Sequence, residues 1–175
     1  MSASIGKVLL THEQIVDRCE ELGTIISRDY QDKNLVIVGL LNGSVPFLAE
    51  LVKHISLPLR FDFVRAKSYC GTTMRGKLEL VHDLDLDIHG QDVLVVDDIL
   101  DSGQTMSCIA TMMEEKGAKS VRTCCLLMKP DVKKDYEVHL DYCGFEIPNE
   151  FVIGFGLDYD ELYRNLPYIG VLKLD

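Results

Sequence analysis

Three aspartates stand close together in the segment VLVVDDILDSGQT, which spans residues 93–105. Asp97 and Asp98 directly follow four apolar residues, and Asp101 comes three positions later. Two adjacent carboxylates repel each other, and carboxylates at the end of a buried strand must also give up water. A ligand that offers hydroxyl groups would make the arrangement favourable, because each carboxylate can accept a hydrogen bond. The vicinal hydroxyls of a sugar fit this pattern.

The four residues after Asp101 form a turn of small and polar residues, Ser102-Gly103-Gln104-Thr105. A helix is expected to begin here, and the first N–H groups of a helix attract anions. The hydroxyls of Ser102 and Thr105 add donors, and Gly103 lets a ligand approach the backbone. The spacing and the lysine of an ATP-binding P-loop are absent. A ribose 5-phosphate therefore suits the whole segment, whereas helix capping alone would need one acid and not three.

The elements that must position these residues alternate between apolar strands and helices. Continuous apolar runs predict strands covered on both faces, at residues 35–41, 93–96 and 121–127. Half-exposed or shorter strands are expected at residues 59–64, 138–142 and 151–153. Strands and helices in this order predict crossover units and a mostly parallel sheet.

Helix boundaries are marked by local signals. Thr11 and Gln14 fit a capping box ahead of residues with helical apolar spacing. Pro46 suits the first turn of a second helix, and residues 105–116 predict a third helix that Gly117 closes. The turns at 42–44 and 101–105 both follow buried strands, so both should face the crevice beyond the carboxyl ends of the sheet.

Composition limits the possible functions. The chain has 175 residues, a formal net charge of -10 and 47% apolar residues. No basic cluster suggests a nucleic-acid surface, and no apolar run approaches the length of a membrane span. The six cysteines include no C-x-x-C pair and the five histidines show no metal-ligand spacing. These features indicate a cytoplasmic protein with reduced thiols.

Several segments resemble one known family. The segment at 93–105 resembles the phosphoribosyl diphosphate signature of the type I phosphoribosyltransferases. GLLNGSVPFLAEL is similar to the pyrophosphate-binding loop of that family, and RAKSYCG to the start of its catalytic loop. LLMKP and GFEIPNEFVIGFGLDYDELYRNLPYIG are similar to the purine-binding strand and the hood of its hypoxanthine-guanine branch.

The resemblance implies an α/β fold of one domain over residues 1–175, with a mostly parallel central sheet flanked by helices. The core would span residues about 30–142, and a small hood would come from residues 1–12 and 143–175. A lid loop would cover residues 68–77. The implied ligands are phosphoribosyl diphosphate, a purine base and Mg²⁺, and the implied assembly is a homodimer or homotetramer.

The resemblance also assigns roles to particular residues. Asp101 would be the general base for the purine, and Ser68 and Tyr69 would lie on the closing loop. Residues that hold the ribose and its 5-phosphate would be Asp97, Asp98, Ser102, Gly103, Gln104 and Thr105. Those that bind pyrophosphate would be Leu41, Asn42, Gly43 and Arg164. The purine would meet Lys129, Phe151, Val152 and Asp158, and Mg²⁺ would meet Asp158, Asp97 and Asp98.

The implied reaction moves 5-phosphoribosyl to N9 of hypoxanthine or guanine. A xanthine-preferring relative or a phosphoribosyl diphosphate-binding regulator of the same fold are the alternatives, and the acidic charge argues against a nucleic-acid-binding regulator. Each residue also has a simpler reading: Lys129 as an exposed strand-end lysine, Phe151 as core, Asp158 as a turn acid, and Arg164 as a helical partner of Glu161. The family usually has Lys or Arg where this chain has Asn42, and often Glu at the position of Asp97.

Overall fold

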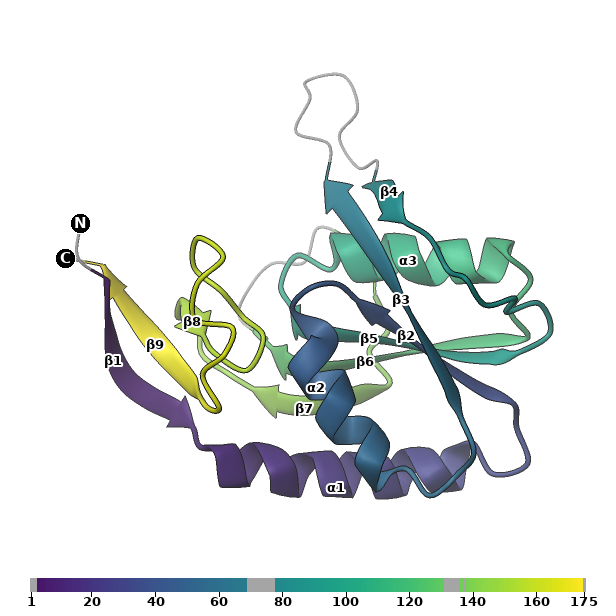
Figure 1. The fold of residues 1–175 in the computed structure, drawn as a ribbon, viewed down its shortest axis with the longest axis horizontal. Helices are drawn as coiled ribbons and strands as arrows, with labels where there is room; N and C mark the ends of the chain where they lie inside the picture. The colour runs from purple at the N-terminus through teal and green to yellow at the C-terminus, as the bar shows by residue number, and fades with distance from the viewer. Residues whose placement is uncertain (1–2, 69–77, 131–135, 137, 175) are drawn as a thin grey trace.

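The computed structural model describes residues 3–68, 78–130, 136 and 138–174. A six-stranded sheet forms the centre, with the strand order β4-β3-β2-β5-β6-β7 (Figure 1). Five of its strands run parallel and β4 runs antiparallel at one edge. The strands are β2 (Leu35–Leu40), β3 (Arg60–Ser68), β4 (Leu78–His82), β5 (Asp92–Leu100), β6 (Ser120–Met128) and β7 (Tyr142–Glu146).

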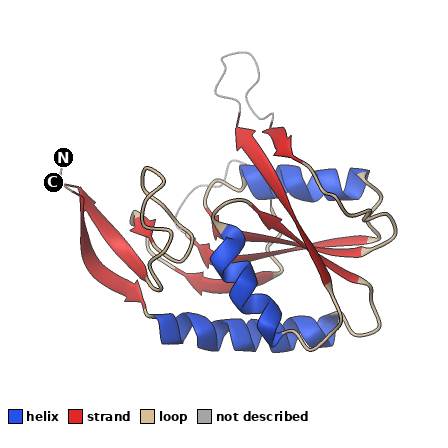
Figure 2. Ribbon diagram, in the orientation of Figure 1, coloured by secondary structure: helices blue, strands red, loops and turns tan. Residues whose placement is uncertain are grey.

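Helices cover both faces of this sheet (Figure 2). Helices α1 (His12–Asp29) and α2 (Ser44–Leu51) pack on one face, and the short 3-10 helix η1 (Val52–His54) continues α2. Helix α3 (Gln104–Glu115) packs on the other face. Neighbouring strand residues divide between two apolar clusters, as Cys124 and Cys125 do. The predicted strands with two covered faces are therefore confirmed.

The helix boundaries follow the local signals in the sequence. Thr11 accepts the N–H of Gln14 at 3.3 Å, and the Gln14 side chain accepts the N–H of Thr11 at 2.9 Å. The capping box is thus present at the start of α1. Gly117 follows α3 with a φ of 83°, the left-handed conformation expected of a residue that closes a helix.

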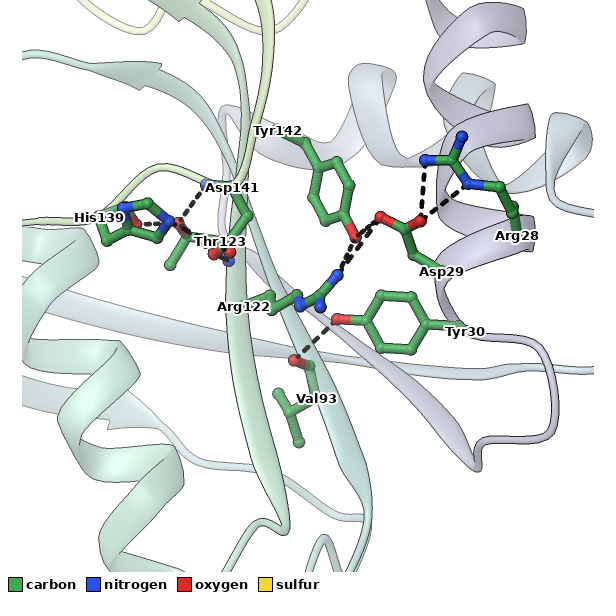
Figure 3. A network of polar contacts seen from close by, with 9 residues as sticks. All are labelled: Arg28, Asp29, Tyr30, Val93, Arg122, Thr123, His139, Asp141 and Tyr142. Atoms are coloured by element: carbon green, nitrogen blue, oxygen red, sulfur yellow. Dashed lines mark hydrogen bonds and ion pairs between the residues drawn. The ribbon is translucent and has the colours of Figure 1, made fainter.

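The strand expected at residues 138–142 lies later than predicted, because β7 begins only at Tyr142. Val138 and Leu140 do pack against the second apolar cluster. One backbone bond and two side-chain bonds stand in for a strand ladder here. The Asp141 N–H donates to the Thr123 carbonyl at 3.2 Å, the Asp141 carboxylate accepts the N–H of Thr123 at 2.9 Å, and the Thr123 hydroxyl donates to the His139 carbonyl at 2.6 Å (Figure 3). The apolar residues of this segment therefore pack against the core without forming a strand before Tyr142.

Beside this contact, a polar network ties α1 to the edge of the sheet (Figure 3). Arg122 donates to the Tyr142 hydroxyl at 2.7 Å, and that hydroxyl donates to Asp29 at 3.0 Å. The Tyr30 hydroxyl donates to the Val93 carbonyl at 3.4 Å. These bonds hold the end of α1 against β5, β6 and β7.

A second, three-stranded sheet joins the two ends of the chain. Strand β9 (Ile169–Leu174) lies between β1 (Ala3–Leu10) and β8 (Val152–Ile153), and both pairings are antiparallel. The ends of β1 and β9 lie side by side in Figure 1. This sheet brings residues 151–158 near the carboxyl end of the central sheet, where Phe151, Val152 and Asp158 line a cavity with Asp98.

Candidate functional site

The acidic pair lies within β5 and not after it, since this strand continues to Leu100. Asp97 stands opposite Cys125 in the β5–β6 ladder. The Asp98 N–H donates to the Asp97 carboxylate at 2.9 Å, and the Ile99 N–H donates to the Asp98 carboxylate at 2.7 Å. Both carboxylates are half-buried.

Burial and mutual repulsion set the charge state of the pair. Burial is the main cause that raises the pKa of Asp97 well above its usual value, and the negative charge of Asp98 raises it further. Burial also raises the pKa of Asp98, although hydrogen bonds and the positive charge of Arg164 oppose the rise. Two carboxylates that are costly to ionise favour a ligand that brings hydroxyl donors or a cation.

A small cavity of about 70 Å³ opens beside the pair at the start of α3. Gly103 precedes the helix with a φ of 82°, and the Gln104 N–H donates to the Ser102 hydroxyl at 3.3 Å. Ser102, Gly103 and Thr105 line the cavity, whereas Gln104 does not. Its other lining residues are Asp97, Ile99, Leu100, Asp101 and Met106. Hydroxyls and a helix N-terminus in one hollow suit a phosphate.

A second cavity, of about 210 Å³, brings together the residues expected to bind a purine. Its walls come from the end of β5, the residue after β6, and the segment around β8. The lining residues are Asp98, Ile99, Asp101, Lys129, Phe151, Val152, Leu157 and Asp158. Because Ile99 and Asp101 line both cavities, the two hollows are neighbours along β5 and its following turn.

Phe151 presents its ring at this cavity. Its side chain is 52% exposed, so the alternative that it belongs to the core is wrong. The Tyr159 ring meets it edge to face, with centroids 5.8 Å apart. An exposed aromatic ring held by a neighbour is a suitable platform for stacking a flat base. Val152, in contrast, is buried in β8.

The turn after β2 lies against the acidic pair. The peptide bond between Leu41 and Asn42 is cis, and the Val45 N–H donates to the Asn42 carbonyl at 3.3 Å. Gly43 has a φ of -65° and so needs no glycine for its conformation. It needs one for space, because a Cβ atom there would overlap the Asp98 carboxylate.

Arg164 closes a turn-rich segment that follows β8. It donates to the Gly156 carbonyl at 2.7 Å and forms ion pairs with Asp158 at 2.9 Å and Glu161 at 3.1 Å. The Asp158 carboxylate also accepts the N–H of Glu161 at 2.9 Å. The simpler readings of Asp158 as a turn acid and of Arg164 as a partner of Glu161 are therefore both present, although no helix forms there.

Comparison with known proteins decides the family. Residues 6–160 match the phosphoribosyl transferase domain. The hypoxanthine-guanine phosphoribosyltransferase of Lactococcus lactis is 48% identical, over 99% of this chain and 94% of that protein. The chain belongs to the hypoxanthine-guanine phosphoribosyltransferase family. The enzyme of the same name from Bacillus subtilis is 43% identical, over 99% of this chain and 96% of that protein.

Solved phosphoribosyltransferases share the fold. A hypoxanthine phosphoribosyltransferase from Staphylococcus aureus superposes with a TM-score of 0.92 at 44% identity, covering 97% of this chain and 92% of that one. One from Trypanosoma cruzi, in complex with the product IMP, gives 0.90 at 35% identity, covering 97% and 95%. The predicted type I phosphoribosyltransferase fold is thus confirmed.

Two residues predicted for phosphoribosyltransferase catalysis fall at the limit of the described structure or beyond it. Ser68 is the last residue of β3, and its side chain lies outside the described part of the structure. Tyr69 and the rest of the predicted lid loop also lie outside the described residues. Their roles stay predictions.

Sequence reasoning missed residues that line the base cavity without polar groups. Ile99 and Leu157 are its apolar walls. Ile99 could have been predicted from its position between the acidic pair and Asp101. An apolar side chain among polar ones at the end of a strand is expected to contact the core or a ligand. No pattern in the sequence marked Leu157 or the packing of Gly156.

The described residues contain no group of three or more His, Cys, Asp or Glu side chains arranged to hold a metal ion. Asp97 and Asp98 still offer the oxygen ligands that Mg²⁺ prefers, and substrate phosphates commonly complete such a site. Within the same residues, no helix is long and apolar enough to cross a membrane.

Proposed function

We propose that this protein transfers the 5-phosphoribosyl group of phosphoribosyl diphosphate to N9 of hypoxanthine or guanine, forming IMP or GMP and releasing pyrophosphate. One observation carries the proposal: a cavity with phosphate-binding chemistry adjoins a cavity with purine-binding chemistry, and Asp101 lines both. In a nucleotide the sugar lies between the base and the phosphate, so two neighbouring cavities of this chemistry suit one nucleotide. The names of the relatives at 43–48% identity support the same reaction.

The ribose would lie over the acidic pair. Asp97 and Asp98 accept hydrogen bonds from the 2- and 3-hydroxyls, which relieves the desolvation of two adjacent carboxylates. The 5-phosphate binds at the N-terminus of α3, where Ser102 and Thr105 donate. Gln104 contributes through its backbone and not through its side chain.

The base would stack on Phe151 and present its 6-oxo group to Lys129. A charged donor at O6 favours oxopurines over adenine, because an amino group cannot accept its hydrogen bond. Asp101 accepts the N7 proton while N9 attacks C1 of the ribose. The polar backbone of Val152 and the carboxylate of Asp158 meet the other edge of the base.

Pyrophosphate would leave toward the turn at Leu41, Asn42 and Gly43. This turn precedes α2, whose first N–H groups have no acceptor within the helix. Arg164 adds a positive charge close enough to oppose the rise that burial causes in the pKa of Asp98. Asp97, Asp98 and Asp158 would hold Mg²⁺, and when bound this ion stabilises the negative charge that develops on pyrophosphate.

We also expect a homodimer or homotetramer in the cytoplasm. Large apolar side chains are exposed next to the pyrophosphate turn and on β3, namely Val45 at 40% and Phe61 at 51%. Single exposed apolar side chains are common on monomers as well, so the expected assembly rests on the family resemblance. Light scattering after size exclusion measures the assembly directly.

The experiment is an assay of pyrophosphate release from phosphoribosyl diphosphate with hypoxanthine, guanine, xanthine and adenine in turn, with and without Mg²⁺. Release with hypoxanthine and guanine, and little with adenine, is the expected result. Release with xanthine alone would identify the xanthine-preferring relative. No release with any purine, from protein that is folded and binds phosphoribosyl diphosphate, would contradict the transferase proposal.

A further inference from the structure

Gly156 lies in the segment that carries part of the base cavity, between β8 and β9. Its neighbour Leu157 lines that cavity, as does Asp158. Both polar groups of its backbone are bound to Arg164: the Gly156 N–H donates to the Arg164 carbonyl at 3.0 Å, and the Gly156 carbonyl accepts from the guanidinium at 2.7 Å. This backbone is therefore fixed in place by two hydrogen bonds to one residue.

The other side of Gly156 faces the turn after β2. A Cβ atom at Gly156 would overlap the carbonyl oxygen of Gly43, and would stand 3.0 Å from the Gly43 carbonyl carbon and 3.1 Å from Pro46. An overlap such as that with the Gly43 oxygen essentially does not occur for real Cβ atoms, so the two backbones pack at a distance that only glycine allows. Gly156 also has a φ of 102°, a backbone conformation that residues with a side chain rarely adopt.

Gly43 is thus held between two partners. The Asp98 carboxylate occupies the space of its missing side chain, and Gly156 lies against its carbonyl group. Three segments that contribute to the ribose, base and pyrophosphate regions meet at this point. A displacement of the Gly43 peptide would move the N–H groups at the start of α2, which are the expected donors to pyrophosphate.

We propose that Gly156 is a positioning residue for the pyrophosphate turn: it sets the place of the Gly43 peptide and so the affinity for phosphoribosyl diphosphate. The inference rests on the proposed function of this turn. Gly156 touches no substrate itself and acts through Gly43. Because the product nucleotide has no pyrophosphate, binding of GMP should depend far less on Gly156 than binding of phosphoribosyl diphosphate does.

A matched control separates this contact from the general strain of placing alanine at a positive φ. Gly90 has a φ of 70°, and a Cβ atom there would have nothing within 4 Å. It lies just before β5, at the opposite end of that strand from the acidic pair. Both substitutions place alanine at a positive φ, which is 102° at Gly156 and 70° at Gly90, and only Gly156→Ala introduces the overlap with Gly43.

The experiment compares wild type and both variants by steady-state kinetics, by calorimetric titration with GMP and by thermal unfolding. Gly156→Ala is expected to raise KM for phosphoribosyl diphosphate at least about tenfold over Gly90→Ala, or about 1.4 kcal/mol. The Kd for GMP should change less than about threefold. The Tm should fall below that of Gly90→Ala, because a methyl group that overlaps the Gly43 carbonyl also strains the fold.

A KM for phosphoribosyl diphosphate close to that of Gly90→Ala would overturn the inference. Equal losses of GMP and phosphoribosyl diphosphate binding, or a Gly156→Ala chain that does not fold while Gly90→Ala does, would assign the residue a purely structural role and would also overturn it. Wild-type protein without transferase activity would instead contradict the proposed function, independently of both variants.

Discussion

The carboxylate of Asp98 fills the place that a side chain on Gly43 would occupy. Asp98 belongs to the acidic pair of β5, and Gly43 belongs to the turn between β2 and α2. Strands β2 and β5 are parallel neighbours in the centre of the sheet, so the two residues meet at the carboxyl ends of these strands. The expected ribose site and the expected pyrophosphate site therefore share one van der Waals contact.

This contact predicts the effect of changes in the turn. Gly43→Ala should lower kcat/KM for phosphoribosyl diphosphate at least about a hundredfold, because the added methyl displaces either Asp98 or the turn. The Gly43→Ala loss comes from lack of space and not from backbone strain, because φ at Gly43 is -65°.

Asn42→Ala should raise KM for phosphoribosyl diphosphate within about tenfold, since backbone groups are the expected ligands. Steady-state kinetics on folded variants measures both. Loss of activity in Asn42→Ala with retention in Gly43→Ala would show that the Asn42 amide is itself a ligand.

Asp101 predicts a change in rate rather than in folding. Asp101→Asn is nearly isosteric and the residue is exposed, so the Tm should stay within about 2 °C of wild type. The kcat should fall about a hundredfold or more, because general-base catalysis commonly supplies factors of 10²–10⁴. Single-turnover kinetics reports the chemical step directly. A folded variant with near-normal kcat would remove Asp101 from the role of base.

The position of Lys129 in the base cavity predicts that its removal weakens the binding of the purine alone. Lys129→Ala should weaken binding of hypoxanthine and guanine by roughly 1.5–3 kcal/mol, the worth of a hydrogen bond to a charged group. The KM for phosphoribosyl diphosphate should change little. Lys119→Ala, at an exposed lysine before β6, serves as control. Equal effects on both substrates would place the Lys129 side chain elsewhere.

The acidic pair predicts a conflict between stability and function. The folded-state pKa of Asp97 is raised, so the folded protein holds more protons than the unfolded chain between the two pKa values. Stability without ligand should therefore fall as the pH rises through this range. Asp97→Asn should raise the Tm at pH 7.5 by about 2–4 °C, the effect of roughly 1 kcal/mol in a domain of this size.

The rise in Tm caused by Asp97→Asn should be smaller at pH 5, because the carboxyl of Asp97 is protonated in a larger fraction of wild-type molecules there. Affinity for phosphoribosyl diphosphate should fall in the same variant. Thermal unfolding at both pH values, with calorimetric titration, tests the two effects together. A lower Tm at pH 7.5 would mean that Asp97 stabilises the fold as a carboxylate, contrary to the direction of its pKa.

Local patterns in the sequence predicted the central strands and the start of the first helix. Runs such as residues 93–96 gave the central strands, and Thr11 and Gln14 gave the start of α1. Strands β1 and β9 were missed. In β1 the apolar side chains do not mark a buried face, since Ile5 and Val8 are 38% and 50% exposed. These strands form by pairing with each other across the length of the chain, which no local signal encodes.

The candidate site divides in the same way. Asp97, Asp98 and the Ser102–Thr105 turn are neighbours in sequence, so their chemistry could be predicted from spacing alone. The packing of Gly43 against Asp98, and of Gly156 against Gly43, depends on three segments that only the tertiary fold brings together. A glycine required for space rather than for conformation leaves no trace in a single sequence.

The most direct test of the account is a crystal structure of the protein with GMP bound. We predict the phosphate at Ser102–Thr105, the ribose hydroxyls on Asp97 and Asp98, and the base stacked on Phe151 with O6 toward Lys129. A nucleotide bound elsewhere, or with its base at the N-terminus of α3, would contradict the assignment of the two cavities.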